Sequence, residues 1–305
     1  MALKNVALFG ANGNLGTEAL KALVSSGHFR VTVIKRESSA YTLPPALFTD
    51  AHVRTVDDEL SLASLEAALQ GQDAVVVSIP LRDPAQHLRI ASAAAAVGVR
   101  RLIPADYGSC DSDSARAQEL VPLFRNKAGV RAHLQGLAAA DPAFAWTSLV
   151  CGHFFDWGLR ENFLHFDLAR RTALVLDRGE YRSSTSTLAR ICEAVVAVLA
   201  ADADATRNKV LFIQSFCVSQ LDVLAALEKA TGGAKWVVDF VDSEAFIKEN
   251  KAKADAGDRD AIEDLVFALG ALDGNWETRD EFSMDLLKLE NEDLDEVVKR
   301  VVDSQ

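Results

Sequence analysis

Short apolar runs alternate with segments of helical periodicity through the first half of the chain. Apolar residues that recur every three or four positions predict helices from residue 15 up to Gly27, at 62–69, at 84–97 and at 120–137. The apolar runs between them, typical of buried strands, cover residues 5–9, 30–34, 53–56, 73–78, 101–104 and 145–151. Nearly continuous apolar strands separated by helices indicate a parallel sheet covered on both faces. The sequence therefore predicts a doubly wound, Rossmann-type α/β domain.

The pattern is less regular after Gly152. Two short segments at 173–176 and 181–185 are followed by a helix at 188–199, a strand at 209–214, a helix at 218–231 and an acidic, helical tail. Doubly wound folds bind the cofactor at the carboxyl ends of the strands, with the substrate site built over it. We therefore expect residues 1–152 to bind the cofactor and residues 153–305 to form a smaller, mixed α/β substrate-binding part that is interleaved with the first.

The stretch GANGNLG, residues 10–16, lies directly between the first predicted strand and helix. In that context Gly10 allows a tight turn, Gly13 lets the backbone approach a pyrophosphate and Gly16 lets the helix pack on the strand. The spacing departs from the commoner G-x-G-x-x-G, so a flexible turn is the alternative, but the strand and helix around it favour dinucleotide binding. The expected cofactor contacts from this turn are Gly10, Asn12, Gly13, Asn14, Leu15 and Gly16.

The end of the second predicted strand indicates which dinucleotide binds. NAD-binding domains usually have an acidic residue there, which accepts a hydrogen bond from the ribose 2′-hydroxyl. This chain has Lys35 and Arg36 at that place, and their positive charges suit a 2′-phosphate. We therefore expect NADPH, although one of the two cations could be a solvated strand-end charge. Asp57 is placed to approach the adenine, with a plain surface charge as the alternative. Ser78 and Pro80 are placed to border the nicotinamide, with packing as the alternative.

Composition narrows the class of protein. The 305 residues are 49% hydrophobic and 25% charged, with a net charge of −12, so nucleic acid and anionic membrane are not expected partners. The four cysteines and six histidines are scattered without ligand spacing, which argues for free thiols and no metal. No leader and no spanning apolar stretch is evident. We expect a cytoplasmic monomer or homodimer that acts on a small molecule.

Catalytic chemistry must come from a group other than the Tyr-x-x-x-Lys pair of short-chain reductases, because no tyrosine here precedes a lysine by four residues. Lys127 falls on the apolar stripe of the helix predicted at 120–137. Burial there lowers the pKa of a lysine toward the range useful for proton transfer. The alternative is a lysine that snorkels past the stripe to water.

Several motifs make the chain similar to the isoflavone-reductase-like group of atypical short-chain reductases, within the NmrA-like superfamily. The chain most resembles the fungal, phenylcoumaran-benzylic-ether-reductase-like members. The motifs are GANGNLG, the Lys35-Arg36 pair, Leu102–Gly108 in the place of the family's P-S-E-F-G, Asn126-Lys127, Gly152–Trp157, the helix from Leu188 and Asn208-Lys209. The resemblance extends to about residue 240.

This resemblance implies an NADPH-dependent reductase of phenolic or related secondary metabolites, with Lys127 matching the family's catalytic lysine. The chain departs from the family with Asp106 in place of Glu and Tyr107 in place of Phe. Other superfamily members bind the dinucleotide and act as redox-sensing regulators without turnover. The sequence therefore predicts hydride transfer to an aromatic, phenolic or enone-type substrate with Lys127 as general acid/base, and the alternative is a non-catalytic NAD(P) sensor.

Candidate substrate contacts follow the last strand of the first half. His153, Phe154, Phe155 and Trp157 come directly after it, at the carboxyl edge where a substrate would lie, and aromatic faces suit an aromatic ligand. Core packing explains Phe154 or Phe155 equally well. Tyr107 completes the expected substrate-binding set.

Overall fold

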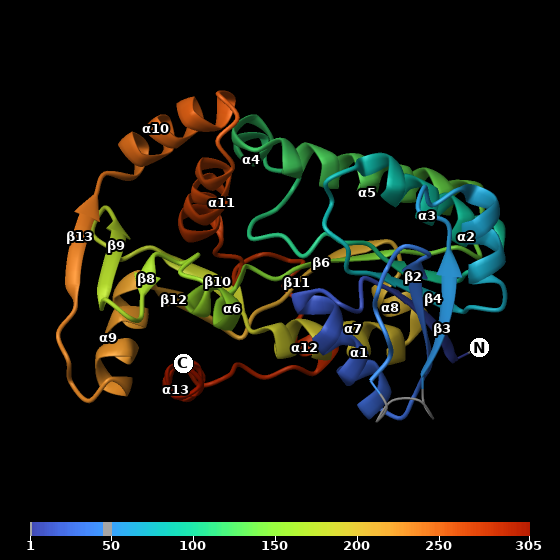
Figure 1. Ribbon diagram of the computed structural model, residues 1–305, viewed down its shortest axis with the longest axis horizontal. Coiled ribbons are helices and arrows are strands. Elements are labelled where there is room, and N and C mark those ends of the chain that lie inside the picture. Colours follow the sequence, from blue (N-terminus) through green and yellow to red (C-terminus); the bar gives the residue numbers. More distant parts are fainter. Residues whose placement is uncertain (1, 45–50) are drawn as a thin grey trace.

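The computed structural model describes residues 2–44 and 51–305, and a parallel β-sheet forms its centre (Figure 1). Its strands are β1 (Asn5–Phe9), β2 (Arg30–Arg36), β3 (Ala51–Val56), β4 (Ala74–Val77), β5 (Arg101–Ile103), β6 (Thr147–Val150) and β11 (Lys209–Phe212). The first five pair in the order β3-β2-β1-β4-β5, all in parallel. A parallel bridge from Leu102 to Trp146 extends the sheet to β6, which pairs in parallel with β11.

Helices cover both faces of this sheet (Figure 1). One face carries α1 (Asn14–Ser25) and α7 (Leu188–Ala200), and the other carries α2 (Leu62–Leu69), α3 (Pro84–Ala96) and α5 (Pro122–Ala140). Side chains of β1 alternate between the two cores: Val6 and Leu8 pack with α1 and α7, whereas Ala7 and Phe9 pack with α2 and α3. The predicted doubly wound α/β fold is confirmed.

The second half of the chain builds a smaller, mixed part at one end of the molecule (Figure 1). One of its sheets contains β7 (His153–Phe154), β10 (Arg182–Ser186) and β12 (Phe216–Ser219), and the other contains β8 (Phe166–Asp167), β9 (Thr172–Leu176) and β13 (Val237–Val241). The helices around them are α4 (Ala115–Leu120), α6 (Phe155–Arg160), α9 (Gln220–Ala230), α10 (Ser243–Asp255), α11 (Arg259–Asp273) and α13 (Leu294–Asp303). Short helices α8 (Ala203–Thr206) and α12 (Met284–Leu287) lie nearer the main sheet.

The second half also contributes to the first. Strand β11 pairs with β6 at the edge of the main sheet, and α7 packs along α1. No helix in the described part of the chain combines the length and the apolar character needed to cross a membrane.

Three predicted elements differ from the structure. The helix expected at 120–137 is α5, which begins two residues later, at Pro122, and ends at Ala140; Leu120 belongs to α4, which Pro122 cannot continue because it has no N–H. The helix expected at 218–231 begins at Gln220, where Ser219 and Asp222 form a capping box that ends β12. The tail expected to be helical contains β13, whose β-branched and aromatic residues pair in parallel with β9.

Candidate functional site

The glycine turn at 10–16 joins β1 to α1 with no room for a side chain at Gly10 or Gly16. Gly10 has a φ of +84°, and a Cβ at Gly16 would lie 1.9 Å from the carbonyl oxygen of Gly10. Gly13 is the N-cap of α1, no side chain caps the helix, and a Cβ at Gly13 would have the Gly10 carbonyl oxygen at 3.4 Å as its nearest neighbour. The turn therefore leaves the helix N-terminus open to an anion.

A cavity of about 580 Å³ lies beside this turn, at the carboxyl ends of β1, β2 and β3. That edge of a doubly wound sheet is where nucleotides bind, and the volume is within the range of small-molecule sites. The cavity is lined by Phe9, Gly10, Ala11, Asn12, Val33, Ile34, Lys35, Arg36, Ser38, Ser39, Tyr41, Val56, Leu60, Ile79, Pro80, Arg82, Asp83 and Gln86.

Three cationic side chains surround this cavity. Lys35 Nζ donates to the carbonyl oxygens of Ser39 and Tyr41, at 3.0 and 3.1 Å, and Arg36 donates to Gln86 Oε1 at 2.9 Å. Within residues 2–44 and 51–305 the guanidinium of Arg82 makes no hydrogen bond or ion pair, so it is available to an anion in the cavity. The predicted pair therefore gains a third cation from the segment between β4 and α3.

The remaining predicted cofactor residues lie at different depths. Pro80 lines the cavity, and Ser78 Oγ donates to the carbonyl oxygen of Phe9 beneath the turn. Leu15 is 7% exposed and belongs to the core under α1, whereas Asn14 is exposed at the start of that helix. Asp57 accepts from the backbone N–H and the hydroxyl of Ser61 at the start of α2, which lowers the pKa of Asp57, and it does not line the cavity.

Lys127 is buried in α5, with 8% of its surface exposed, and its ammonium lies 5.4 Å from the centre of the Phe124 ring. Burial lowers the pKa of Lys127, while the nearby carboxylate of Asp106 opposes that shift. Lys127 and Asp106 line a small cavity of about 10 Å³ together with Leu81, Pro104 and Ala105. Because Leu81 directly follows Pro80, this cavity and the nucleotide-sized one adjoin the same segment.

Asp106 holds a buried ion pair next to Lys127. Its Oδ2 accepts a hydrogen bond from Arg131 Nε at 2.5 Å. Only 2% of the Asp106 side chain and 3% of the Arg131 side chain are exposed. The other carboxylate oxygen, Oδ1, is buried without a hydrogen-bond partner among the described residues. Arg131 also contacts Asp111 and Asp113, at 3.0 and 3.2 Å. The arrangement gives Lys127 a fixed negative neighbour with one oxygen uncommitted.

The five predicted substrate contacts divide into two groups. Tyr107, Phe154 and Trp157 pack against the core between β1 and α7, and Phe154 and Trp157 are half-buried. Phe155 is 1% exposed with its ring edge-on to Phe216, and His153 is buried against α11. Burial lowers the pKa of His153 to about 4, so this imidazole is neutral near pH 7.

Sequence reasoning missed several groups at these cavities. The nucleotide-sized cavity is also lined by three residues from loops and a helix face: Arg82, Gln86 and Tyr41. Of these, only Arg82 could have been suspected from the sequence, because its positive charge suits a phosphate. The hydroxyl of Tyr41 is buried without a hydrogen-bond partner among the described residues. Arg131 had a detectable signal, because an arginine four residues after Lys127 lies on the same apolar face of the helix.

Comparison with known proteins places the chain in a family. The sequence profile of the NmrA-like family matches residues 2–254. A relative named oxidoreductase aprR, from Aspergillus flavus, is 34% identical over 240 residues, which is 78% of this chain and 77% of that protein.

Solved structures share the fold across nearly the whole chain. A structure described as AtPrR2 with NADP+ and (+)-pinoresinol is 17% identical, covers 99% of both chains and has a TM-score of 0.78. An isoflavone reductase is also 17% identical with a TM-score of 0.78, covering 98% of this chain and 99% of its own. The predicted resemblance is confirmed by the profile match and by this shared fold. The chain belongs to the NmrA-like family.

Proposed function

We propose that this protein is an NADPH-dependent reductase that transfers a hydride to a small aromatic, phenolic or enone-type substrate, with Lys127 as general acid/base. One observation carries the proposal. The same edge of the sheet holds a glycine turn beside a cavity lined by cationic side chains and, next to it, the buried Lys127 beside the carboxylate of Asp106. The family relative named an oxidoreductase and the fold shared with an NADP+-bound structure support it.

The residues around the larger cavity fit NADPH. A Cβ at Gly16 would overlap the Gly10 carbonyl oxygen, so glycine at this position lets α1 pack closely on the end of β1, as a dinucleotide-binding turn requires. Tyr41 lines the cavity, and its buried hydroxyl has no hydrogen-bond partner among the described residues, which leaves one unused hydrogen-bonding group next to the cavity. Lys35, Arg36 and Arg82 supply positive charge for a 2′-phosphate. When bound there, NADPH supplies the hydride.

Lys127 is suited to hold the proton that accompanies reduction. As an ammonium beside Asp106 it can donate to an oxygen or carbon that gains negative charge, and burial strengthens the interaction by excluding water. Asp106 stays paired to Arg131 and keeps the ammonium form accessible. We assign substrate contacts to Phe154 and Trp157, which are half-buried, before Tyr107, His153 and Phe155, which are 9%, 5% and 1% exposed.

One observation favours the second candidate, a nucleotide-sensing protein without turnover. The space beside Lys127 is about 10 Å³, which is at the lower limit for one water molecule, so a substrate enters only if neighbouring side chains move. A sensor needs no such space.

A substrate panel separates the two candidates. We expect the protein to oxidise NADPH when given phenolic ethers, enones and quinone-like compounds, as measured by the loss of NADPH absorbance. A catalytically silent protein that retains NADPH and engages a partner protein in only one redox state of the nucleotide would instead establish the sensor.

Cofactor choice gives a further prediction. NADPH should bind at least tenfold more tightly than NADH, which corresponds to about 1.4 kcal/mol. Lys35 and Arg36 now donate to neutral oxygens, of Ser39 and Gln86, and on binding NADPH they would donate instead to the charged 2′-phosphate, which accepts stronger hydrogen bonds. The double variant Lys35→Ala/Arg36→Ala should lose most of that preference in calorimetric titration.

Arg30→Ala is the matched control, because it removes one positive charge from the opposite end of the same strand, β2. It should keep the preference of the parent protein. Equal affinity of the parent for both nucleotides would contradict the assignment.

A further inference from the structure

The outer strand of the smaller part, β13, carries the most exposed large apolar side chains of the described chain. Val237 is 71% exposed and Phe240 is 56% exposed, and no other large apolar residue among residues 2–44 and 51–305 exceeds 54%. β13 lies at the end of the molecule that is far from the N-terminus (Figure 1). Large apolar groups exposed together on one short strand are typical of an interaction surface.

One edge of β13 is open. Its sheet has the order β13-β9-β8, so β9 is the only strand that pairs with β13 in the part of the chain that the structure describes. The N–H of Val237 donates to the carbonyl oxygen of Arg171, just before β9. In a parallel ladder the N–H and C=O of one residue face the same neighbour, so the peptide groups of residues 236, 238 and 240 face away from β9. β13 can therefore pair with one more strand.

Opposite charges flank Val237 on the exposed face of this segment. Exposure alternates along it: Lys235, Val237 and Asp239 are exposed, whereas Trp236 is 8% exposed and Val238 is half-buried. The three exposed side chains therefore lie on one face of an extended chain, two residues apart. The face reads positive, apolar, negative along the direction of the strand.

A second copy of this chain fits the open edge in one antiparallel register. With a two-fold axis at Val237, this valine faces its own counterpart, and Lys235 of each copy lies opposite Asp239 of the other. Trp236 and Val238 exchange backbone hydrogen bonds with the second copy through the peptide groups that face away from β9. An axis at Asp239 would place two carboxylates opposite each other, and an axis at Val238 would pair neither charge with its opposite. Charge complementarity therefore selects the register centred on Val237.

We propose that the open edge of β13 pairs with β13 of a second copy of this chain and joins the two three-stranded sheets into one. Charges on an edge strand usually prevent such pairing, but in this register each charge meets its opposite. Lys235, whose side chain is 86% exposed, exchanges a contact of 3.4 Å with Glu228 for one with Asp239. One pair of strands buries less surface than a standard interface, so dimerisation should be weak and should depend on concentration.

Sedimentation equilibrium over a range of protein concentrations tests the proposal. We expect the parent protein to shift from monomer toward dimer as the concentration rises. Lys235→Asp places like charges opposite each other at both pairs, and so does Asp239→Lys, so each variant alone should lose at least tenfold in dimer affinity. A heterodimer of the two variants has opposite charges at both pairs. Their equimolar mixture should therefore dimerise about as tightly as the parent protein.

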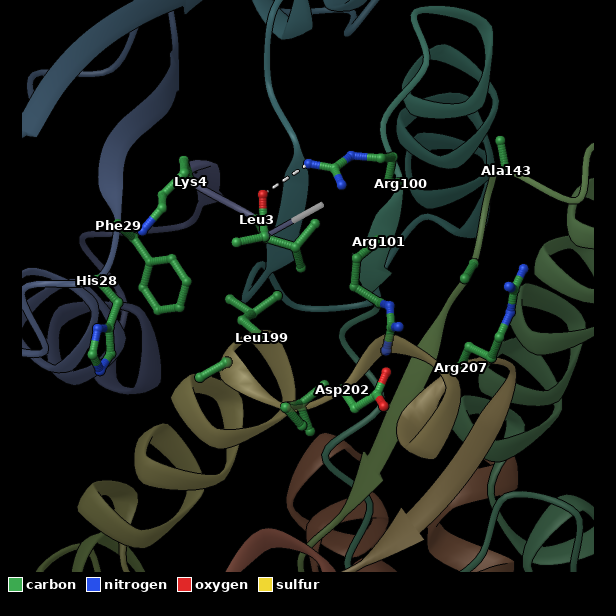
Figure 2. A pocket seen from close by; sticks show the side chains of 15 residues that line it. Leu3, Lys4, His28, Phe29, Arg100, Arg101, Ala143, Leu199, Asp202 and Arg207 are labelled. Atoms are coloured by element: carbon green, nitrogen blue, oxygen red, sulfur yellow. Dashed lines mark hydrogen bonds between the residues drawn. The ribbon is translucent and has the colours of Figure 1, made fainter.

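Lys4→Asp is the matched control, because it makes the same change as Lys235→Asp at an exposed lysine far from β13. Figure 2 shows Lys4 beside Phe29, on the wall of a cavity at the amino ends of the main strands. This variant should dimerise like the parent protein.

Two results would overturn the proposal. A parent protein that stays monomeric at every concentration would leave Lys235 and Asp239 as charges that keep the edge unpaired. A mixture that dimerises no better than either variant alone would exclude the register centred on Val237. Both substituted positions are exposed, and dimerisation of the mixture would itself show that both variants fold. None of these outcomes depends on whether the protein binds NADPH or reduces a substrate.

Discussion

Replacing Lys127 with methionine should lower turnover by about 10²–10⁴-fold while the affinity for NADPH stays close to that of the parent protein. Methionine keeps the length and apolar character of the side chain in α5 but has no proton to transfer. NADPH affinity is expected to persist, because the nucleotide-sized cavity is lined by other residues. Steady-state kinetics and nucleotide titration measure the two quantities separately.

The free energy of unfolding distinguishes a catalytic loss from a structural one. Burial holds the pKa of Lys127 in the folded state below its value in the unfolded state. Below the folded-state pKa the buried charge therefore lowers the free energy of unfolding. Between the folded-state and unfolded-state pKa values the unfolded chain binds more protons, so stability rises with pH through that range. Lys127→Met removes this cost, so its unfolding free energy at neutral pH should not fall below that of the parent protein.

Two further observations sharpen the test. Only the ammonium form donates a proton, so parent turnover should decrease as pH rises through the lowered pKa of Lys127. Lys127→Arg should not restore turnover, because a guanidinium stays charged in this range. Parent-like turnover in Lys127→Met would leave Lys127 as a packing residue and move the proton donor to another group.

The sequence predicted the main sheet well, because its signals are local. The apolar runs of β1 and β4 and the glycine turn at 10–16 each identify an element from a few adjacent residues. β13 was missed although four of its five residues are β-branched or aromatic, because it lies within a tail that is otherwise acidic and helical and its pairing partner β9 lies far away in the chain.

The candidate site was predictable only in part, for the same reason. Lys127 could be placed on a buried stripe from helical spacing alone. That Asp106 pairs with Arg131 depends on how the end of β5 meets α5, which spacing along the chain does not specify. His153 and Phe155 follow β6 in sequence as expected, but the chain turns them into the core below α11, where Gly270 leaves room for the imidazole.

Asp106→Asn should destabilise the protein by about 3–5 kcal/mol, because it leaves the buried guanidinium of Arg131 without its closest carboxylate. Asp111 and Asp113 still contact Arg131 but are more exposed, with 18% and 65% of their side chains accessible. Chemical denaturation measures the loss. The double variant Asp106→Leu/Arg131→Met should recover most of it, since replacing both partners removes the uncompensated charge.

Turnover tests the second role assigned to Asp106, that of a positioning residue for Lys127. The carboxylate of Asp106 opposes the lowering of the Lys127 pKa, so Asp106→Asn should lower that pKa further. The decrease in turnover at high pH should therefore begin at a lower pH than in the parent protein. If the ion pair were purely structural, Asp106→Asn would reduce the free energy of unfolding without moving this limb of the pH profile.

Asp111→Asn is the matched control, because Asp111 also pairs with Arg131, at 3.0 Å, yet it is not among the groups that shift Lys127. It should cost less stability than Asp106→Asn, since Asp111 is partly hydrated, and it should leave the pH profile of turnover unchanged. Equal displacement of the profile by both variants would mean that Arg131, rather than Asp106, sets the charge state of Lys127.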